Sequence, residues 1–216
     1  MFRGPVGSGG NIRQLTESKE LYIFEACLDS AACRRMQAAM DAGLTEMAEV
    51  LDDEIEVRDE VRRVASIEVD PAIVAEIEQR FDDQLEPIAA FFGLNLSGRE
   101  GAGFLRYADG GFYRAHRDRA FVASWPDAAR RAIALVVFLN GSRDEGLEGA
   151  FGGGALRVFV GDHAIDVVPK QGMLVAFPAD LLHEVLEVVG GTRDTIVDWL
   201  YDGSASSSNF KVQTSK

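Results

Sequence analysis

Two of the three histidines in this chain lie where they could bind a metal ion together with a carboxylate. His116-Arg-Asp118 ends the stretch that begins at Tyr107, and His183 follows in a later apolar segment. Side chains two residues apart on an extended backbone face the same way, so His116 and Asp118 can converge on one ion. Two imidazoles and a carboxylate with open coordination positions suit a non-haem Fe(II) centre. H-x-D alone is a common chance pattern, so the prediction depends on His183, whose burial in an expected strand needs a reason. We read His163, in a Gly-Asp-His turn, as an ordinary surface residue.

Arg193 lies ten residues after His183 and extends the pattern. Gly190-Gly191 predicts a tight turn, so that strand 192–201 runs back past strand 182–189. Alternate residues of the later strand, from Arg193 through Thr195 and Val197 to Trp199, then share one face. At ~3.4 Å per residue, Arg193 would lie roughly 15 Å from the metal. Its planar guanidinium suits bidentate binding of the far carboxylate of a dicarboxylate that chelates the metal.

The elements after Gly93 predict a mainly β core. Short segments rich in Val, Leu, Phe and Tyr alternate with glycine-containing turns, which is typical of a sandwich or barrel such as the jelly roll. The expected strands are 102–107, 112–117, 131–139, 154–160, 164–168, 172–177, 182–189 and 192–201. An N-terminal helical layer should support this core, which makes the fold class α+β.

The first hundred residues predict that helical layer. Asp29 or Ser30 can cap a helix through the following ten residues, and Asp70-Pro71 can begin a second helix that reaches Phe91. Pro87 should bend or split the second helix, and Gly93 should end it. The expected elements between them are a helix or connector over 44–60 and a strand over 61–69.

We divide the chain into four parts on this basis. They are a flexible N-terminus over 1–18, a helical support segment over 19–99, a β core over 100–202 and a polar tail over 203–216.

The composition narrows the classes of function. A formal charge of −13 argues against a nucleic-acid partner, which would need a basic surface. The chain has no apolar run of membrane-span length and no signal-peptide core, so we expect a cytoplasmic protein without a membrane partner. Cys27 and Cys33 are expected to be reduced thiols. The acidic stretch 41–60 is expected to be a solvated helix face, with a docking face for a basic partner as the alternative.

These motifs, in this order and spacing, resemble the Fe(II)/2-oxoglutarate-dependent dioxygenases, and most of all their prolyl 4-hydroxylase-like branch. The resemblance covers about residues 100–201. The matching motifs are Leu105-Arg-Tyr107, Gly110-Gly-Phe-Tyr113, His116-x-Asp118, Val137-Phe-Leu-Asn140, Gly153-Gly-Ala-Leu156, Phe177-Pro-x4-His183-Glu-Val185 and Gly191-Thr-Arg193 with Trp199.

The resemblance implies a double-stranded β-helix (a jelly roll, cupin-like) and a set of residue roles. His116, Asp118 and His183 match the metal-binding triad and catalytic centre. Arg193 matches the partner of the distal carboxylate of 2-oxoglutarate, with Thr195 and Tyr107 beside it. The implied cofactors are Fe(II), 2-oxoglutarate as co-substrate, O2, and ascorbate as a reductant. The implied reaction hydroxylates a C–H bond and converts 2-oxoglutarate to succinate and CO2.

The substrate is less well defined than the metal site. Tyr113 matches a residue nearer the substrate, and Trp199 matches an aromatic wall beside the metal, so both are candidate substrate contacts. The loops 119–130 and 141–153 should flank the mouth, and Arg117 and Trp125 are further candidate substrate contacts. A free amino acid, a prolyl or peptidyl residue and a carrier-bound molecule all remain open. The oligomeric state is not indicated.

Two positions depart from the family pattern. Phe138 stands where relatives often have a tyrosine that holds the co-substrate, and Ala155 stands where many have glutamate.

Two other classes of function also stay open. One is a cupin-like metal protein with non-oxidative chemistry, which would not need Arg193, and the other is a catalytically silent binding module.

Overall fold

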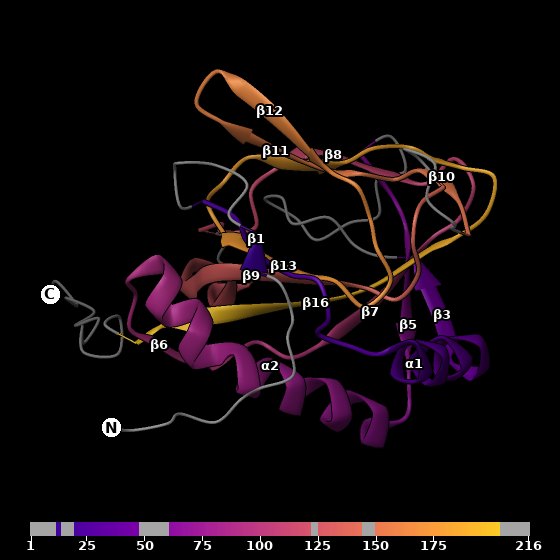
Figure 1. Cartoon of the computed structure of the whole chain (residues 1–216), viewed down its shortest axis with the longest axis horizontal. Coiled ribbons are helices and arrows are strands. Elements are labelled where there is room, and N and C mark those ends of the chain that lie inside the picture. The colour runs from indigo at the N-terminus through magenta and orange to yellow at the C-terminus, as the bar shows by residue number, and fades with distance from the viewer. Residues whose placement is uncertain (1–11, 14–19, 48–60, 122–124, 144–149, 204–216) are drawn as a thin grey trace, which may run out of the picture.

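Two facing antiparallel sheets, with two helices on the outer face of the larger sheet, make up the computed structural model (Figure 1). The structure describes residues 12–13, 20–47, 61–121, 125–143 and 150–203. This arrangement is a double-stranded β-helix with supporting helices, which confirms the predicted fold class.

The larger sheet has nine strands and the facing sheet has five. In spatial order the larger sheet consists of β1 (Ile12–Arg13), β2 (Tyr22–Phe24), β13 (Leu174–Pro178), β9 (Arg131–Phe138), β16 (Arg193–Asp202), β7 (Gly103–Tyr107), β5 (Ala65–Glu68) and β3 (Leu44–Met47), with β6 (Leu96–Arg99) also paired to β16. The smaller sheet consists of β12 (His163–Val167), β11 (Leu156–Val160), β14 (His183–Val185), β8 (Phe112–His116) and β4 (Arg62–Arg63). A third pair joins β10 (Gly152–Gly153) to β15 (Val188–Val189), and a 3-10 helix covers Pro126–Arg130.

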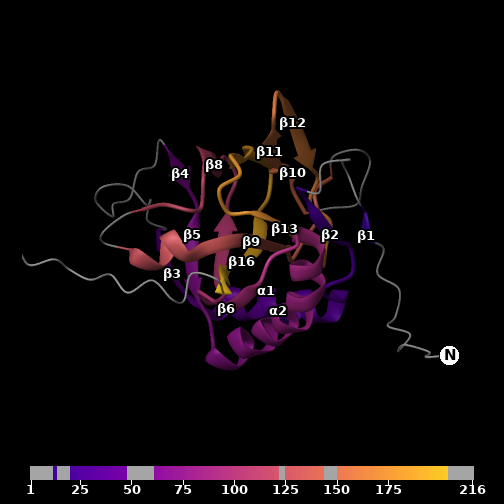
Figure 2. The ribbon, with the colours of Figure 1, turned by 90° about the vertical axis from the view of Figure 1, so that its left-hand side faces the viewer.

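The two helices begin and end at the residues that the sequence marks. Helix α1 (Ser30–Ala42) starts at Asp29, whose side chain accepts a hydrogen bond from the Ala32 N–H at 2.7 Å. Helix α2 (Pro71–Phe92) is capped in the same way by Asp70. It ends at Gly93, whose φ of 68° lies in the left-handed region that glycine adopts without strain. Figure 2 shows both helices beneath the larger sheet, on the side away from β8, β11 and β12.

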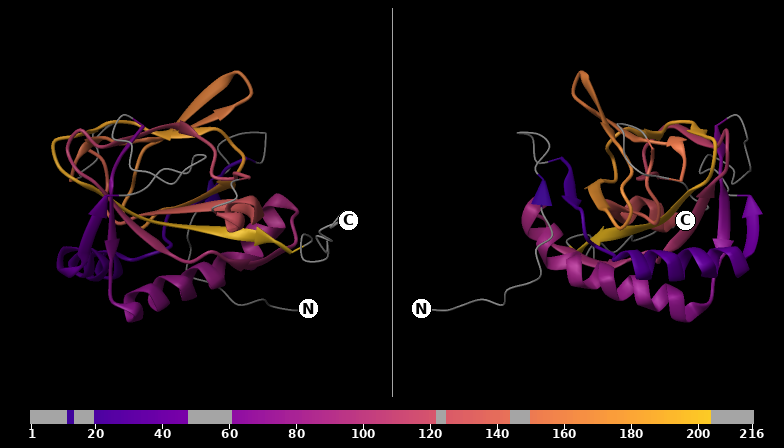
Figure 3. Two further views of the ribbon diagram at one scale, coloured as in Figure 1. Left: turned by 180° about the vertical axis from the view of Figure 1, so that it is seen from behind. Right: turned by 45° about the vertical axis from the view of Figure 1, so that its right-hand side comes forward.

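Each face of the larger sheet packs against a different layer. On β9, Ile133, Leu135 and Val137 point toward the helices and join the core that α1 and α2 cover. The intervening residues, such as Val136 and Phe138, point toward the smaller sheet and join the core between the two sheets. The strand therefore reads as a continuous apolar run because both of its faces are buried. The hairpin of β11 and β12 extends beyond these layers (Figure 3).

The support segment differs from the sequence-based prediction at Leu44–Met47, and one of the two outcomes expected at Pro87, a split helix, is excluded. Leu44–Met47, expected to be helical or a connector, forms β3 and pairs with β5, while 48–60 lies outside the described residues. Helix α2 is not split at Pro87. Ile77, Phe81 and Ile88 are fully buried along it, and this packing on the sheet offsets the hydrogen bond that proline cannot donate.

The predicted pairing of the last two long strands is wrong. β14 pairs with β11 and β8 in the smaller sheet, whereas β16 pairs with β9 and β7 in the larger sheet. The chain changes layers between them, through β15 and the Gly190-Gly191 turn. A Cβ atom on Gly191 would lie 2.2 Å from the carbonyl oxygen of Ala150, so this crossing needs glycine. His183 and Arg193 consequently face one another from opposite layers rather than lying on one hairpin.

No helix in the described part of the chain is both long and apolar enough to cross a membrane.

Candidate functional site

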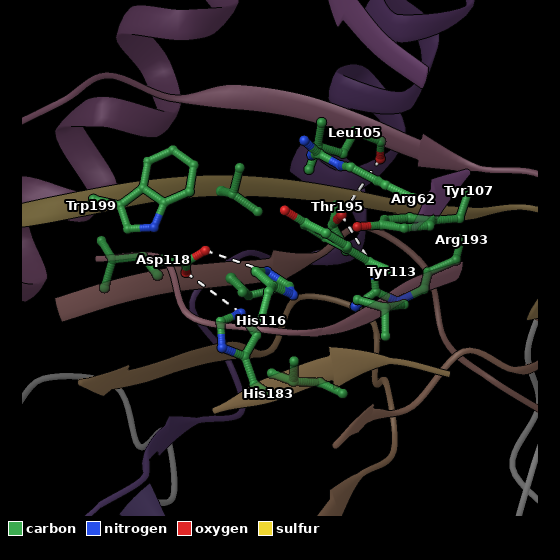
Figure 4. A pocket seen from close by; sticks show the side chains of 15 residues that line it. Arg62, Leu105, Tyr107, Tyr113, His116, Asp118, His183, Arg193, Thr195 and Trp199 are labelled. Atoms are coloured by element: carbon green, nitrogen blue, oxygen red, sulfur yellow. Dashed lines mark hydrogen bonds and ion pairs between the residues drawn. The ribbon is translucent and has the colours of Figure 1, made fainter. Parts of the chain in front are cut away.

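The side chains of His116, Asp118 and His183 meet between the two sheets (Figure 4). The Asp118 carboxylate lies 3.5 Å from Nε2 of His116 and 3.6 Å from Nε2 of His183. His116 ends β8 and His183 begins β14, and the two residues are direct partners across the strand pair. Their candidate ligand atoms all lie within 4.8 Å of one another, which is close enough to bind one ion.

Backbone carbonyl groups fix how both imidazoles are presented. Nδ1–H of His116 donates to the carbonyl of Arg114 at 2.8 Å, and Nδ1–H of His183 donates to the carbonyl of Leu181 at 2.9 Å. A carbonyl oxygen can only accept, so the proton lies on Nδ1 and the Nε2 lone pair points into the site. Second hydrogen bonds of this kind are typical of metal-binding histidines. The donor set therefore fits Fe(II), with three protein ligands and coordination positions left over.

The electrostatics keep Asp118 and His183 in their metal-binding forms at neutral pH. Burial alone would raise the pKa of the Asp118 carboxyl, but His183, His116 and the Trp199 indole hold that pKa well below its usual range. Burial lowers the pKa of His183 to about 4, against the opposing effect of Asp118. Asp118 is therefore ionised and His183 neutral at pH 7.

Aromatic rings surround the histidines. Tyr113 is stacked on His116 with 3.5 Å between ring centroids, and the Phe177 ring meets His183 edge-on at 4.7 Å. Trp199 lies on the other side, with its indole nitrogen directed toward Asp118 (Figure 4). That nitrogen has no hydrogen-bond partner among the described residues. These rings limit water access on the metal side of the pocket.

A buried arginine lies at the other end of the same pocket. Arg193 is 1% exposed, and its Nε–H donates to the carbonyl of Gly154 at 2.9 Å. The guanidinium lies 3.4 Å from the hydroxyl of Thr195 and 4.9 Å from the ring centroids of both Tyr107 and Phe138. No carboxylate of the described residues forms an ion pair with it. Burial lowers its pKa to about 10, so it remains charged and can bind an anion.

Alternate residues of β16 line this pocket, as the strand periodicity predicts. Leu105 and Tyr107 contribute from the neighbouring β7, and Val185 contributes from β14 in the smaller sheet. Arg62 of β4 also lines it, with its guanidinium carbon 4.6 Å from the Tyr113 ring centroid. Sequence reasoning missed Arg62. The available signal was a charged pair, Arg62-Arg63, within the expected strand 61–69, but that pattern does not tell which arginine points inward.

Three residues that the sequence analysis considered, Arg117, Trp125 and His163, do not line the pocket. Arg117 is exposed and donates to the carbonyl of Asp180. Trp125 precedes the 3-10 helix and lies against Arg131 instead of the pocket. His163 is exposed at the start of β12.

Comparison with known proteins gives a consistent picture. Residues 102–201 match the model of the 2OG-Fe(II) oxygenase superfamily. A PKHD-type hydroxylase of Sphingopyxis alaskensis is 30% identical over 88 residues, which cover 41% of this chain and 38% of that protein. The chain therefore aligns with less than half the length of this curated relative.

Solved structures match over most of the chain. A prolyl-4-hydroxylase of Pseudomonas putida is 26% identical, with a TM-score of 0.62, over 86% of this chain and 94% of its own. A prolyl hydroxylase of Trichoplax adhaerens, solved with a peptide fragment of hypoxia inducible factor, gives a TM-score of 0.67 over 89% of both chains. At 17% identity, the second likeness concerns the fold alone.

Proposed function

We propose that residues 102–201 form a domain of the 2OG-Fe(II) oxygenase superfamily, in its prolyl 4-hydroxylase-like branch, and that the chain is a hydroxylase dependent on Fe(II), 2-oxoglutarate and O2. The observation that carries the proposal is the pairing of two sites in one pocket. A His-Asp-His cluster lies at one end, and a buried guanidinium that forms no ion pair with a carboxylate of the described residues lies at the other.

Each residue of the pocket has a role in this proposal. His116, Asp118 and His183 hold the metal through Nε2, a carboxylate oxygen and Nε2. Arg193 binds the distal carboxylate of 2-oxoglutarate, to which its planar guanidinium can donate two hydrogen bonds. The hydroxyl of Thr195, beside the guanidinium, can bind the same carboxylate. Tyr107 supports the guanidinium from one side. Phe138 has no hydroxyl, so Thr195 replaces the hydrogen bond that a tyrosine there would supply.

When bound, Fe(II) and 2-oxoglutarate would supply the oxidising chemistry with O2 as the oxidant: one oxygen atom would enter succinate as 2-oxoglutarate loses CO2, and the other would convert a substrate C–H bond to C–OH. The chain's own residues orient the reactants and exclude water. Tyr113, Phe177 and Trp199 form apolar walls around the metal ligands. Such walls suit a site in which stray water would divert the reaction.

We infer that the substrate is a prolyl or peptidyl residue or a related amino acid. The prolyl-4-hydroxylase likeness supports this class, and Tyr113 and Arg62 are the pocket residues best placed at its metal side to contact it. Ascorbate as reductant and a cytoplasmic location stay predictions. A cupin-like protein with non-oxidative chemistry is less well supported, because it would have no use for a buried Arg193 that lacks a carboxylate partner among the described residues.

The test begins without oxygen. Anaerobic addition of Fe(II) and 2-oxoglutarate should produce a weak visible charge-transfer band, and admitting O2 should then yield succinate. The control is an Asp118→Ala variant, which lacks one ligand and should give neither signal. A wild-type protein that gives no band and no succinate, with prolyl peptides and free amino acids supplied, would rule the proposal out.

A further inference from the structure

Arg131 is a nearly fully buried arginine that contacts the candidate metal site from behind. It begins β9 in the larger sheet, its side chain is 3% exposed, and it does not line the pocket. One of its terminal N–H groups donates to the backbone carbonyl of Asp118 at 3.0 Å. Asp118 itself follows the end of β8 in the smaller sheet, so this hydrogen bond joins the two sheets at the metal ligand.

Glu100 holds the guanidinium in place. It accepts hydrogen bonds from Nε and from the second terminal nitrogen of Arg131 at 2.6 and 2.5 Å, which is a bidentate pair. The backbone N–H of Glu100 also donates to the carbonyl of Trp199 at 3.0 Å. The pair is therefore anchored to β16 as well as to β9.

The face of the same guanidinium lies over the Trp199 ring, with its carbon 3.7 Å from the ring centroid. The Trp199 indole nitrogen is directed toward the Asp118 carboxylate (Figure 4). Arg131 thus contacts Asp118 directly through the backbone carbonyl, and it packs on the indole ring that faces the Asp118 carboxylate. The hydrogen bond constrains the backbone position of Asp118, and the packing constrains the ring beside its side chain.

We propose that the Arg131–Glu100 pair is a positioning device that holds Asp118 in its metal-binding geometry. The inference rests on the proposed function, because it assumes that Asp118 is a metal ligand. A buried ion pair is a weak source of stability, since desolvation offsets most of its Coulomb energy. Orienting Asp118 would explain why the Arg131–Glu100 pair lies next to this metal ligand.

The experiment measures Co(II) affinity by calorimetry, because Co(II) suits the same donors and binds at least as tightly as Fe(II). In Arg131→Lys, the ammonium keeps the charge but cannot hold Glu100 and the Asp118 carbonyl together. In Arg131→Met/Glu100→Leu, apolar side chains replace the whole pair, an exchange that buried ion pairs often tolerate without loss of stability. Both variants should bind Co(II) about 10–100-fold more weakly, as when the partners of other metal ligands are removed.

Arg99→Lys is the matched control. Arg99 is also largely buried and ion-paired, to Glu78 and Asp82, but it does not line the pocket. Its Co(II) affinity should equal that of the wild type. Melting temperatures of all variants identify losses that come from unfolding, and the double variant carries the test where the lysine variant does not fold.

A second measurement separates positioning from a general effect on the fold. In an Asp118→Ala background, adding Arg131→Lys should change Co(II) affinity by less than about twofold, because a residue that acts through Asp118 has nothing left to act on. Wild-type affinity in the folded double variant, or an undiminished loss in the Asp118→Ala background, would overturn the inference and leave the proposed function standing. Failure of the wild-type chain to bind Co(II) would instead overturn the proposed function itself.

Discussion

Replacing Arg193 with methionine should weaken 2-oxoglutarate binding while leaving the metal site intact. The guanidinium is 1% exposed and donates to Gly154, and no carboxylate of the described residues pairs with it. Methionine fills a similar volume without the charge. Of the metal ligands, His116 lies in β8, Asp118 lies two residues after the end of β8, and His183 lies in β14. Arg193 lies in β16, so its substitution does not alter the metal donors.

The magnitude follows from the burial of this charge. Removing one partner of a buried, hydrogen-bonded charge pair costs about 2–5 kcal/mol, mainly because the other charge is left unpaired. The dissociation constant of 2-oxoglutarate should therefore increase by a factor of between about 30 and several thousand. The apoprotein should respond in the opposite direction. It loses a buried charge that forms no ion pair with the described residues, so its melting temperature should stay the same or rise.

Thermal unfolding of the Co(II)-loaded protein can measure both effects. A ligand present at 100 times its dissociation constant stabilises the wild type by about 2.7 kcal/mol. That corresponds to about 5–11 °C at the ~2–4 °C per kcal/mol expected for a chain of this size. At the same 2-oxoglutarate concentration, a 30-fold weaker variant gains only about 0.9 kcal/mol, or about 2–4 °C. Equal shifts in the two proteins, or a parallel loss of Co(II) affinity in the variant, would refute the assigned role of Arg193.

Three further substitutions test the surroundings of the site and the support layer. Gly154→Ala should weaken 2-oxoglutarate binding in a calorimetric titration, because the new Cβ would lie 2.8 Å from Cε2 of Phe151 and 3.1 Å from Cδ of Arg193. Gly161→Ala has a similar φ but open space, so it should share only the ~1–2 kcal/mol of backbone strain and keep wild-type affinity. Asp198→Asn should become more stable relative to the wild type as pH rises. Burial raises the pKa of Asp198 to about 6, so its stabilising contribution is complete below the unfolded pKa of about 3.9 and is lost as pH rises through about 6. Urea unfolding at pH 4.5 and 7.5 should reveal a change of up to about 1.4 kcal/mol per pH unit within that window, and identical pH dependence in both proteins would contradict the assignment. Pro87→Ala should raise the free energy of unfolding by up to about 3 kcal/mol, because alanine restores the helical hydrogen bond within α2. An unchanged urea midpoint would contradict the view that Pro87 destabilises this helix.

The sequence predicts those parts of the fold that depend on local pattern. Glycine turns delimit most strands of the β core to within one or two residues, and a period of two places Arg193 and Thr195 on the pocket face of β16. The capping residues Asp29 and Asp70 begin the helices where their side chains can accept from the first backbone N–H groups. In each case the physical cause lies within a few residues of the feature.

The features that the sequence does not predict depend on distant partners. Periodicity gives the face of a strand but not its sheet, so β14 and β16 looked like one hairpin although they belong to opposite layers. Leu44–Met47 becomes a strand because β5 offers a partner, not because of its own acidic composition. Arg131 is similar, since a charge at the start of an apolar strand reads as exposed until Glu100, 31 residues earlier, is seen to neutralise it.

The division of the site between the two sheets also limits what local sequence can specify. The metal ligands belong to the β8–β14 side, whereas the guanidinium that receives the far carboxylate belongs to β16 on the other side. The span available to the co-substrate is therefore set by how the sheets pack, through core residues such as Phe138 and Phe177, and not by the ten-residue spacing of His183 and Arg193. The hydrogen bond from Arg131 to Asp118 crosses the same gap. The distance between the metal ligands and Arg193 therefore stays fixed only while the two sheets keep their spacing. The Arg131–Asp118 hydrogen bond, which links the sheets at a metal ligand, helps to maintain that spacing.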